Sequence, residues 1–89
     1  VTPLYMSCQE NRVDIVLSLL NHGANPNLAS HDDGNTPLFA SCQEGHYEIV
    51  QLLLSFGANC NQCTLDDGTP PLFISAQKNH LEIVDLLLQ

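Results

Sequence analysis

The cysteines of this 89-residue chain are the first side chains to consider for metal or redox chemistry. Cys60 and Cys63 are separated by two residues, the spacing found in zinc sites and in thiol oxidoreductases. A structural zinc site needs four ligands, generally two such pairs or one pair with suitably spaced histidines, and here there is a single pair. No helix is predicted after Cys63, as a thioredoxin-like motif would require. We therefore interpret Cys60 as a small buried residue and Cys63 as an incidental surface thiol.

The other chemically capable side chains form no recognisable catalytic set. No arrangement of nucleophile, base and acid can be assembled around the histidines, which are His22, His31, His46 and His80. Three serines recur at a constant interval, which indicates packing rather than catalysis: Ser7, Ser41 and Ser75. We expect a protein that is not an enzyme and that has no cofactor and no metal site.

The elements that must position these residues repeat along the chain. Pairs of residues return every 34 positions, namely Pro3-Leu4, Pro37-Leu38 and Pro71-Leu72, then Ile15-Val16, Ile49-Val50 and Ile83-Val84. Self-similarity at this period is typical of a stacked array, in which each unit buries its apolar face only against its neighbours. Such an array usually serves as a binding surface.

Each unit reads as two short helices followed by an extended segment. In the second unit Thr36 is a good N-cap for the first helix, Gly45 interrupts the chain after it, and Gly57 ends the second helix. Residues 58–67 lack helical periodicity and are rich in turn-forming residues. In the third unit Pro70 replaces the threonine, so that this helix is expected to lack a side-chain cap.

These residues resemble the ankyrin repeat, whose pattern is carried here by Thr36-Pro37-Leu38, Gly45-His46, Ile49-Val50 and Gly57-Ala58-Asn59. The resemblance covers the whole chain. It implies an all-α repeat solenoid of stacked helix-turn-helix units with β-hairpin fingers. Residues 1–89 would form a single domain with repeats at about 1–33, 34–67 and 68–89, the first and last incomplete. The chain is then expected to be a three-repeat fragment of a longer array.

The sequence departs from the ankyrin pattern in ways that affect the interior and the fingers. Each finger is one residue longer than usual, because the pattern has a period of 33. The histidine that follows Pro-Leu is replaced by an aromatic residue (Tyr5, Phe39, Phe73), so apolar contact should replace its polar network. His46 and His80 keep the usual turn position, where we expect local hydrogen bonds.

Charge and cysteine content limit the partners and the compartment. Ten acidic residues face two basic ones, for a net charge of −8, which disfavours nucleic acid and anionic membranes. No run of 18 apolar residues predicts a membrane span. Cys8 and Cys42 are equivalent positions on adjacent helices, and the expected helix spacing is too wide for a disulfide. Four unbridged thiols favour the cytoplasm or nucleus.

We expect a monomeric protein–protein interaction module that binds a neutral or basic protein surface. Ankyrin partners commonly engage finger tips and the concave face of the first helices. By motif position, that surface comprises Gln9, Glu10, His22, Asp32, Asp33, Asn35, Gln43, Glu44, Phe56, Asp66, Asp67, Thr69, Gln77 and Lys78. The alternatives are structural spacer repeats without a direct partner contact and, more remotely, a metal- or redox-responsive module.

Overall fold

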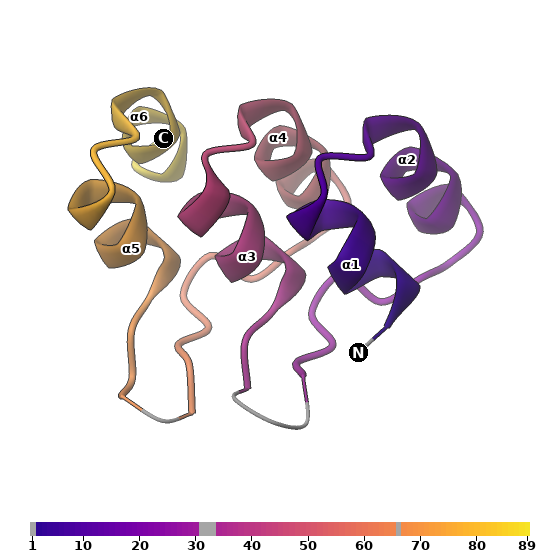
Figure 1. The fold of residues 1–89 in the computed structure, drawn as a ribbon, viewed down its shortest axis with the longest axis horizontal. Helices are drawn as coiled ribbons and strands as arrows, with labels where there is room; N and C mark the ends of the chain where they lie inside the picture. Colours follow the sequence, from indigo (N-terminus) through magenta and orange to yellow (C-terminus); the bar gives the residue numbers. More distant parts are fainter. Residues whose placement is uncertain (1, 31–33, 66) are drawn as a thin grey trace.

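The computed structural model describes residues 2–30, 34–65 and 67–89, in which three helix pairs stand side by side (Figure 1). Their helices are α1 (Pro3–Gln9), α2 (Val13–Asn21), α3 (Pro37–Glu44), α4 (Tyr47–Ser55), α5 (Pro71–Gln77) and α6 (Leu81–Leu87). We call α1, α3 and α5 the inner helices and α2, α4 and α6 the outer helices. Each row packs along its length, and each inner helix packs on the outer helix that follows it. The all-α repeat fold expected from the sequence is confirmed.

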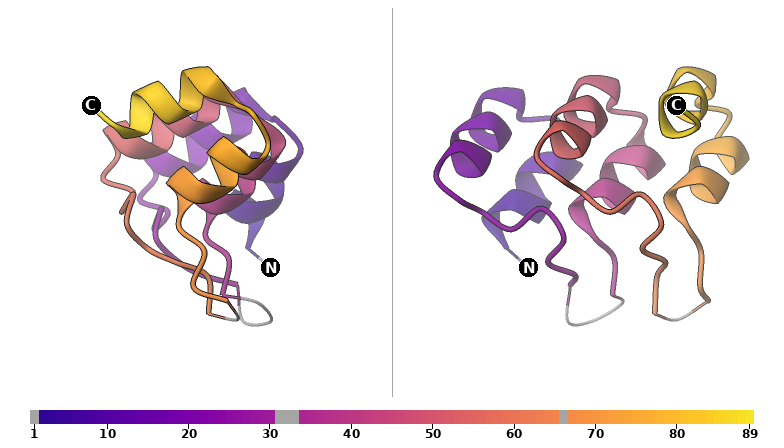
Figure 2. Two further views of the ribbon diagram at one scale, coloured as in Figure 1. Left: turned by 90° about the vertical axis from the view of Figure 1, so that its left-hand side faces the viewer. Right: turned by 180° about the vertical axis from the view of Figure 1, so that it is seen from behind.

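The two rows form two layers, and the segments between repeats extend away from them as fingers (Figure 2). The expected β-hairpins are absent from the described residues, which contain no strand. Each finger is instead closed by a backbone bond across its turn, near the far end of the finger (Figure 1). The amide of Ser30 donates to the carbonyl of Asn35 at 2.9 Å, and that of Thr64 donates to Thr69 at 3.0 Å. Each finger thus reverses direction as a β-hairpin does, but its described residues do not form paired β-strands.

The starts of the inner helices follow the capping chemistry of the sequence. Thr2 and Thr36 lie in extended conformation before a helical proline, and each hydroxyl oxygen accepts a backbone N–H three residues on, at 3.1 Å. Pro70 has no side chain that can do this, and the amide of Phe73 donates to the Pro70 carbonyl instead. The predicted loss of the cap in the third repeat is confirmed.

Polar side chains on the inner helices are satisfied within the core. Ser41 donates its hydroxyl to the Pro37 carbonyl at 2.9 Å, and Ser75 repeats this with its own helix start. Cys8 and Cys42 are free and buried beside Ser41 and Ser75 of the next repeat. Burial raises the pKa of both thiols to about 11, although the serine hydrogen bonds act in the opposite direction.

The histidines at the helix-pair turns make the expected local hydrogen bonds through their backbone, since the amides of His46 and His80 donate to the Ser41 and Ser75 carbonyls at 3.0 and 2.9 Å, but their rings bond elsewhere. His46 Nε2 lies 3.1 Å from the carbonyl oxygen of Gln9, and His80 Nε2 lies 3.2 Å from that of Gln43. Each ring therefore donates to the last turn of the inner helix in the preceding repeat. Stacking is the reason, because it places each turn beside the carbonyl end of the inner helix in the preceding repeat. The bonded residues are 37 positions apart in sequence. These histidines link adjacent repeats.

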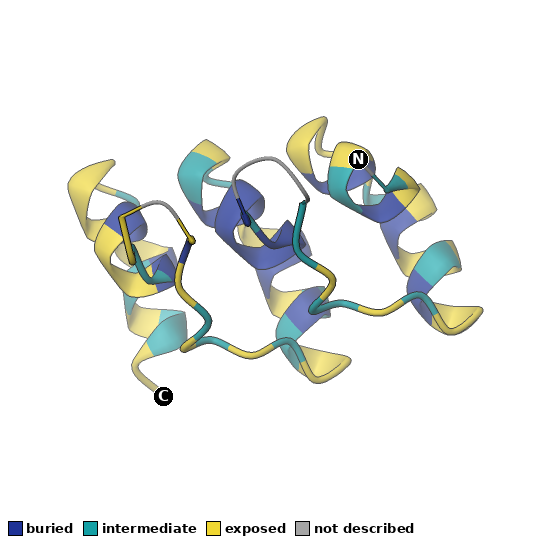
Figure 3. Ribbon diagram, turned by 90° about the horizontal axis from the view of Figure 1, so that it is seen from below, coloured by how far each residue is buried: buried dark blue, intermediate teal, exposed yellow. Residues whose placement is uncertain are grey.

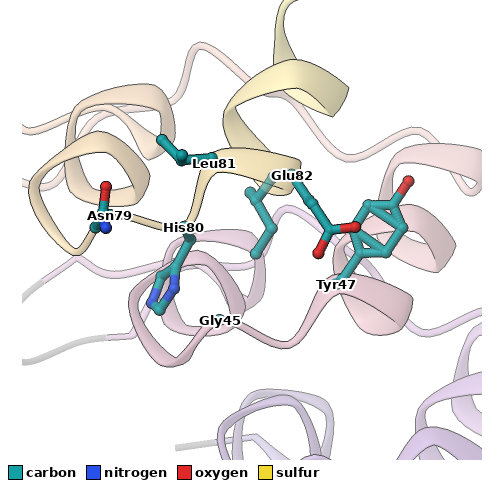
Figure 4. Close-up of a pocket in the computed structure, with 7 residues that line it drawn as sticks. Gly45, Tyr47, Asn79, His80, Leu81 and Glu82 are labelled. Atoms are coloured by element: carbon teal, nitrogen blue, oxygen red, sulfur yellow. The ribbon is translucent and has the colours of Figure 1, made fainter.

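The turn glycine of the middle repeat makes room for the next histidine (Figure 4). Gly45 has φ +78°, and a Cβ atom there would lie 2.6 Å from Cε1 of His80. The equivalent residues in the other repeats, Asn11 and Asn79, also have positive φ, at 60° and 63°. Asparagine tolerates this conformation better than most residues. At Gly45 the ring of His80 also leaves no room for a Cβ atom unless the ring moves.

Apolar contact replaces the usual polar network at one of the three aromatic positions. Phe39, in the middle repeat, is buried within the core cluster. Tyr5 is partly buried, and Phe73 in the last repeat is 56% exposed. The expectation is therefore confirmed at Phe39, whereas Phe73 is largely exposed in the structure. Figure 3 shows the same trend, with the buried positions concentrated in the middle repeat.

Candidate partner-binding groove

A hollow of about 300 Å³ lies between the inner helices and the second finger, and we call it the groove. Residues of α3 and α5 form one wall, and residues on both sides of the finger turns form the other. Its lining comprises Asn35, Phe39, Gln43, Thr64, Asp67, Thr69, Phe73, Ile74 and Gln77. The groove combines aromatic and aliphatic carbon with amide, hydroxyl and carboxylate groups, the mixture found in sites that bind peptides.

The groove owes its helical wall to the repeat period. Gln43 and Gln77 are 34 residues apart and occupy equivalent places near the ends of α3 and α5. Phe39 and Phe73 repeat the relation one helical turn earlier. The small side chains Ser41 and Ser75 are fully buried on these helices, which allows close packing between them. The helical wall of the groove therefore contains two amides and two aromatic rings at equivalent positions of the two repeats.

The finger wall is organised by Asp67. Its Oδ1 accepts hydrogen bonds from the hydroxyls of Thr64 and Thr69, both at 2.6 Å, and from the Thr69 amide at 3.3 Å. The Thr69 amide also donates to Thr64 Oγ1 at 3.0 Å. These bonds give Asp67 a structural role in addition to its expected place on the partner-binding surface. The carboxylate holds the finger turn together while it lines the groove.

Five of the residues expected to contact a partner come together here: Asn35, Gln43, Asp67, Thr69 and Gln77. Others lie at the ends of inner helices, exposed and outside this lining: Gln9, Glu10, Glu44 and Lys78. Asp32, Asp33 and Asp66 lie outside the described residues. The structure thus gathers the polar residues of the second and third repeats, while the expected row of acidic tips is described only at Asp67.

His22 and Phe56 belong to another part of the molecule. They are equivalent C-caps of the outer helices α2 and α4, whereas the groove is lined by inner helices and a finger. Nδ1 of the exposed His22 lies 2.7 Å from the Ser18 carbonyl of its own helix, so the ring caps that helix. Phe56 is 38% exposed, but it does not line the groove. Motif position alone therefore did not distinguish residues of the inner-helix layer from residues of the outer-helix layer.

Sequence reasoning missed the apolar part of the groove. Phe39 and Phe73 were interpreted as interior residues, and neither Ile74 nor Thr64 was selected. A signal for Thr64 existed, because Ser30 stands 34 positions before it and both amides donate across a finger turn.

The thiol pair belongs to no metal-binding cluster in the part of the chain that the structure describes. Cys60 is partly buried and packs against the core, whereas Cys63 is exposed with its thiol 3.6 Å from the Asn61 carbonyl. Within residues 2–30, 34–65 and 67–89, no group of three or more His, Cys, Asp or Glu side chains is placed to hold a metal ion. None of the described helices is long and apolar enough to cross a membrane.

A second hollow of about 310 Å³ lies at the turns between inner and outer helices (Figure 4). Gly45, Tyr47, Asn79, His80, Leu81, Glu82 and Ile83 line it. The imidazole of His80 in this hollow already bonds to the Gln43 carbonyl, and the lining includes one carboxylate, that of Glu82. This composition does not supply a nucleophile–base pair. The groove is therefore the better candidate for a binding site.

Comparison with known families agrees with this architecture. The family model described as Ankyrin repeats (3 copies) matches residues 4–89, nearly the whole chain. A search of curated proteins finds no match. Three stacked helix pairs, fingers that lie beside the inner helices and a match of this extent lead to one assignment: the chain belongs to the ankyrin repeat family.

Proposed function

We propose that this chain binds a segment of a partner protein in the groove between α3, α5 and the second finger. Ankyrin repeats generally serve as protein–protein interaction modules, which supports the class of function. The observation that carries the proposal is the groove itself, because five residues selected independently from the sequence line one hollow. Catalysis finds no comparable support among the described side chains.

Charge favours a partner segment with lysine or arginine. The chain carries a net charge of −8, and Asp67 places one carboxylate in the wall of the groove. A cation near this wall would be attracted both locally and by the whole protein, which raises association rates. The amides of Gln43 and Gln77 offer donors and acceptors to the backbone of an extended segment.

The groove also has a place for an apolar side chain. Phe73 is 56% exposed and stands beside Ile74 and Phe39 in the lining. An aromatic ring that is exposed in the free protein and covered in a complex is a typical centre of binding energy. We therefore expect the partner segment to combine at least one basic and one apolar residue.

A displayed library of random 12-residue peptides, panned against the chain, tests this proposal. The enriched peptides should contain basic and apolar residues together, and their affinity should fall with added salt. Gln77→Lys should weaken them about tenfold, which corresponds to about 1.4 kcal/mol, because it places a positive charge at the edge of the groove.

Gln51→Lys is the matched control. Gln51 is also an exposed helical glutamine, but it lies on the outer helix α4. Both substitutions change the net charge equally, so a difference between them reports the groove and not the overall field. Peptides that bind both variants alike would refute the proposed location. A library that yields no binder would favour spacer repeats that contact no partner.

A further inference from the structure

The hollow at the turns between inner and outer helices combines an aromatic ring with a carboxylate, and we call it the turn hollow (Figure 4). Tyr47 contributes the ring from the second repeat, and Glu82 contributes the carboxylate from the third. The Glu82 carboxylate is directed toward the Tyr47 ring in Figure 4. The residues that line the turn hollow are all different from those that line the groove.

The turn hollow is set between two stacked repeats and not at an end of the stack. Tyr47 and Glu48 begin α4, and α4 packs against both α2 and α6. Tyr47 is nevertheless 38% exposed, and Glu48 is exposed as well. The turns lie on the side of the molecule opposite to the finger tips (Figure 1). This edge of the array therefore stays open to solvent in a repeat that has both of its neighbours.

Two groups in the turn hollow present hydrogen-bond acceptors. The Glu82 carboxylate can accept with both of its oxygens. Nε2 of His80 lies 3.2 Å from the Gln43 carbonyl, which can only accept, so Nε2 carries the proton and Nδ1 of the neutral imidazole is an acceptor. The two bases of the chain, Arg12 and Lys78, do not line the hollow. A cation with several N–H donors would therefore complement this site.

We propose that the turn hollow binds an arginine side chain of a partner protein, with its guanidinium on the Tyr47 ring and against the Glu82 carboxylate. A guanidinium is planar, so it stacks on an aromatic ring while its N–H groups pair with a carboxylate. The volume of about 310 Å³ is at the lower end for small-ligand sites, roughly 300–1,000 Å³, and suits a single long side chain. This site is additional to the groove and does not depend on it.

Other side chains match the turn hollow less well. A lysine ammonium is a compact, strongly hydrated charge and has no planar face to stack on a ring. An apolar side chain would remove water from the Glu82 carboxylate without offering it a partner, which is unfavourable. An acidic side chain would be repelled by Glu82 and by the net charge of −8. Charge and shape together therefore favour arginine.

The repeat period provides an internal comparison for the aromatic ring. The equivalent turn between the first and second repeats has Val13 in place of Tyr47 and Glu48 in place of Glu82. It thus has the exposed carboxylate without the ring. Because a ring face attracts a cation, we expect arginine to prefer the turn hollow to this equivalent turn.

NMR titration of the isotopically labelled chain with Nα-acetyl-arginine amide tests the proposal. The backbone amides of Gly45, Tyr47, His80 and Glu82 should shift, and the shifts should saturate. Nα-acetyl-citrulline amide has nearly the same shape without the charge, and Nα-acetyl-lysine amide has the charge without the planar group. Both should bind more weakly than the arginine probe, by about threefold or more.

Substitutions separate the two parts of the site. Glu82→Gln should weaken binding of the arginine probe about fivefold, as expected for the loss of one well-placed ion pair at a protein surface. Tyr47→Leu should weaken it about threefold, whereas Tyr47→Phe, which keeps the ring, should bind like the unchanged chain. Asp14→Asn is the matched control, because it removes the same charge at the equivalent exposed position of the first repeat. Circular dichroism verifies that each variant is folded.

The outcomes distinguish the turn hollow from the groove. Equal weakening by Glu82→Gln and Asp14→Asn would overturn the proposal, because it would show attraction by the overall charge alone. Absence of saturable shifts would overturn it as well. Shifts confined to groove residues such as Thr64 and Thr69 would place the arginine in the groove, which would refute this site and leave the groove proposal standing.

Discussion

Removing the His80 ring should weaken the contact between the second and third repeats. The ring donates through Nε2 to the Gln43 carbonyl at 3.2 Å and covers the turn at Gly45. His80→Ala deletes both interactions. Because each repeat contacts only its neighbours, the loss falls on this one interface and on the last helix pair, which has no other neighbour in the structure.

The size of the effect follows from these two interactions. A hydrogen bond of this kind contributes about 1 kcal/mol net. Covering the turn with a half-buried ring adds roughly 0.5–1 kcal/mol from apolar area removed from water. The sum of about 1.5–2 kcal/mol corresponds to a fall in melting temperature of roughly 6–15 °C for a domain of this size.

Thermal unfolding followed by circular dichroism provides the measurement, with His22→Ala as the matched control. His22 is an exposed histidine whose ring bonds within its own helix, at the Ser18 carbonyl. Its removal should cost no more than about 0.5 kcal/mol. His80→Gln, which retains a side-chain N–H donor, should recover part of the loss. Equal melting temperatures for His80→Ala and His22→Ala would refute the inter-repeat role of His80.

Three further predictions concern the backbone, the caps and the core. Gly45→Ala should destabilise the fold more than Gly57→Ala, because both glycines have positive φ but only Gly45 has a neighbour in the way of a Cβ; chemical denaturation of both variants measures the difference. Thr36→Ala should cost about 1 kcal/mol through loss of the helix cap, whereas Thr36→Ser should retain the capping bond. The pKa values of Cys8 and Cys42 are raised to about 11 from 9.0, so their contribution to stability is complete below pH 9 and is lost as pH rises through 11. Melting temperatures from pH 8 to 11 should therefore fall less steeply in the double alanine variant of these cysteines, and an identical pH profile would contradict the assignment.

The elements of this fold were predictable because their signals are local. The cap at Thr36, the break at Gly45 and the stop at Gly57 each depend on a few neighbouring residues, and the structure confirms all three. Pro70 shows the same dependence by its missing cap. The β-hairpins were implied by the family resemblance, whereas the described finger residues contain no strand.

The candidate site was partly predictable, and the errors have a common physical cause. Repeat position correctly selected Gln43 and Gln77, because 34 residues return to the same place on the next inner helix. Repeat position also selected Phe56, which is the C-cap of the outer helix α4 and does not line the groove. Repeat position alone does not distinguish such a residue from one that lines the groove. Exposure of Phe73 depends on the number of repeats beside it, which no local pattern states.

The sequence by itself determined the period, the helix boundaries and the apolar positions, because these follow from backbone chemistry and spacing along the chain. Stacking decided what those positions do. It carried the bonds of His46 and His80 into the preceding repeat, gave Asp67 its place in the groove wall, and left equivalent residues buried in one repeat and exposed in another. Contacts between residues more than 30 positions apart exist only once the repeats are stacked, so tertiary structure alone defines the groove.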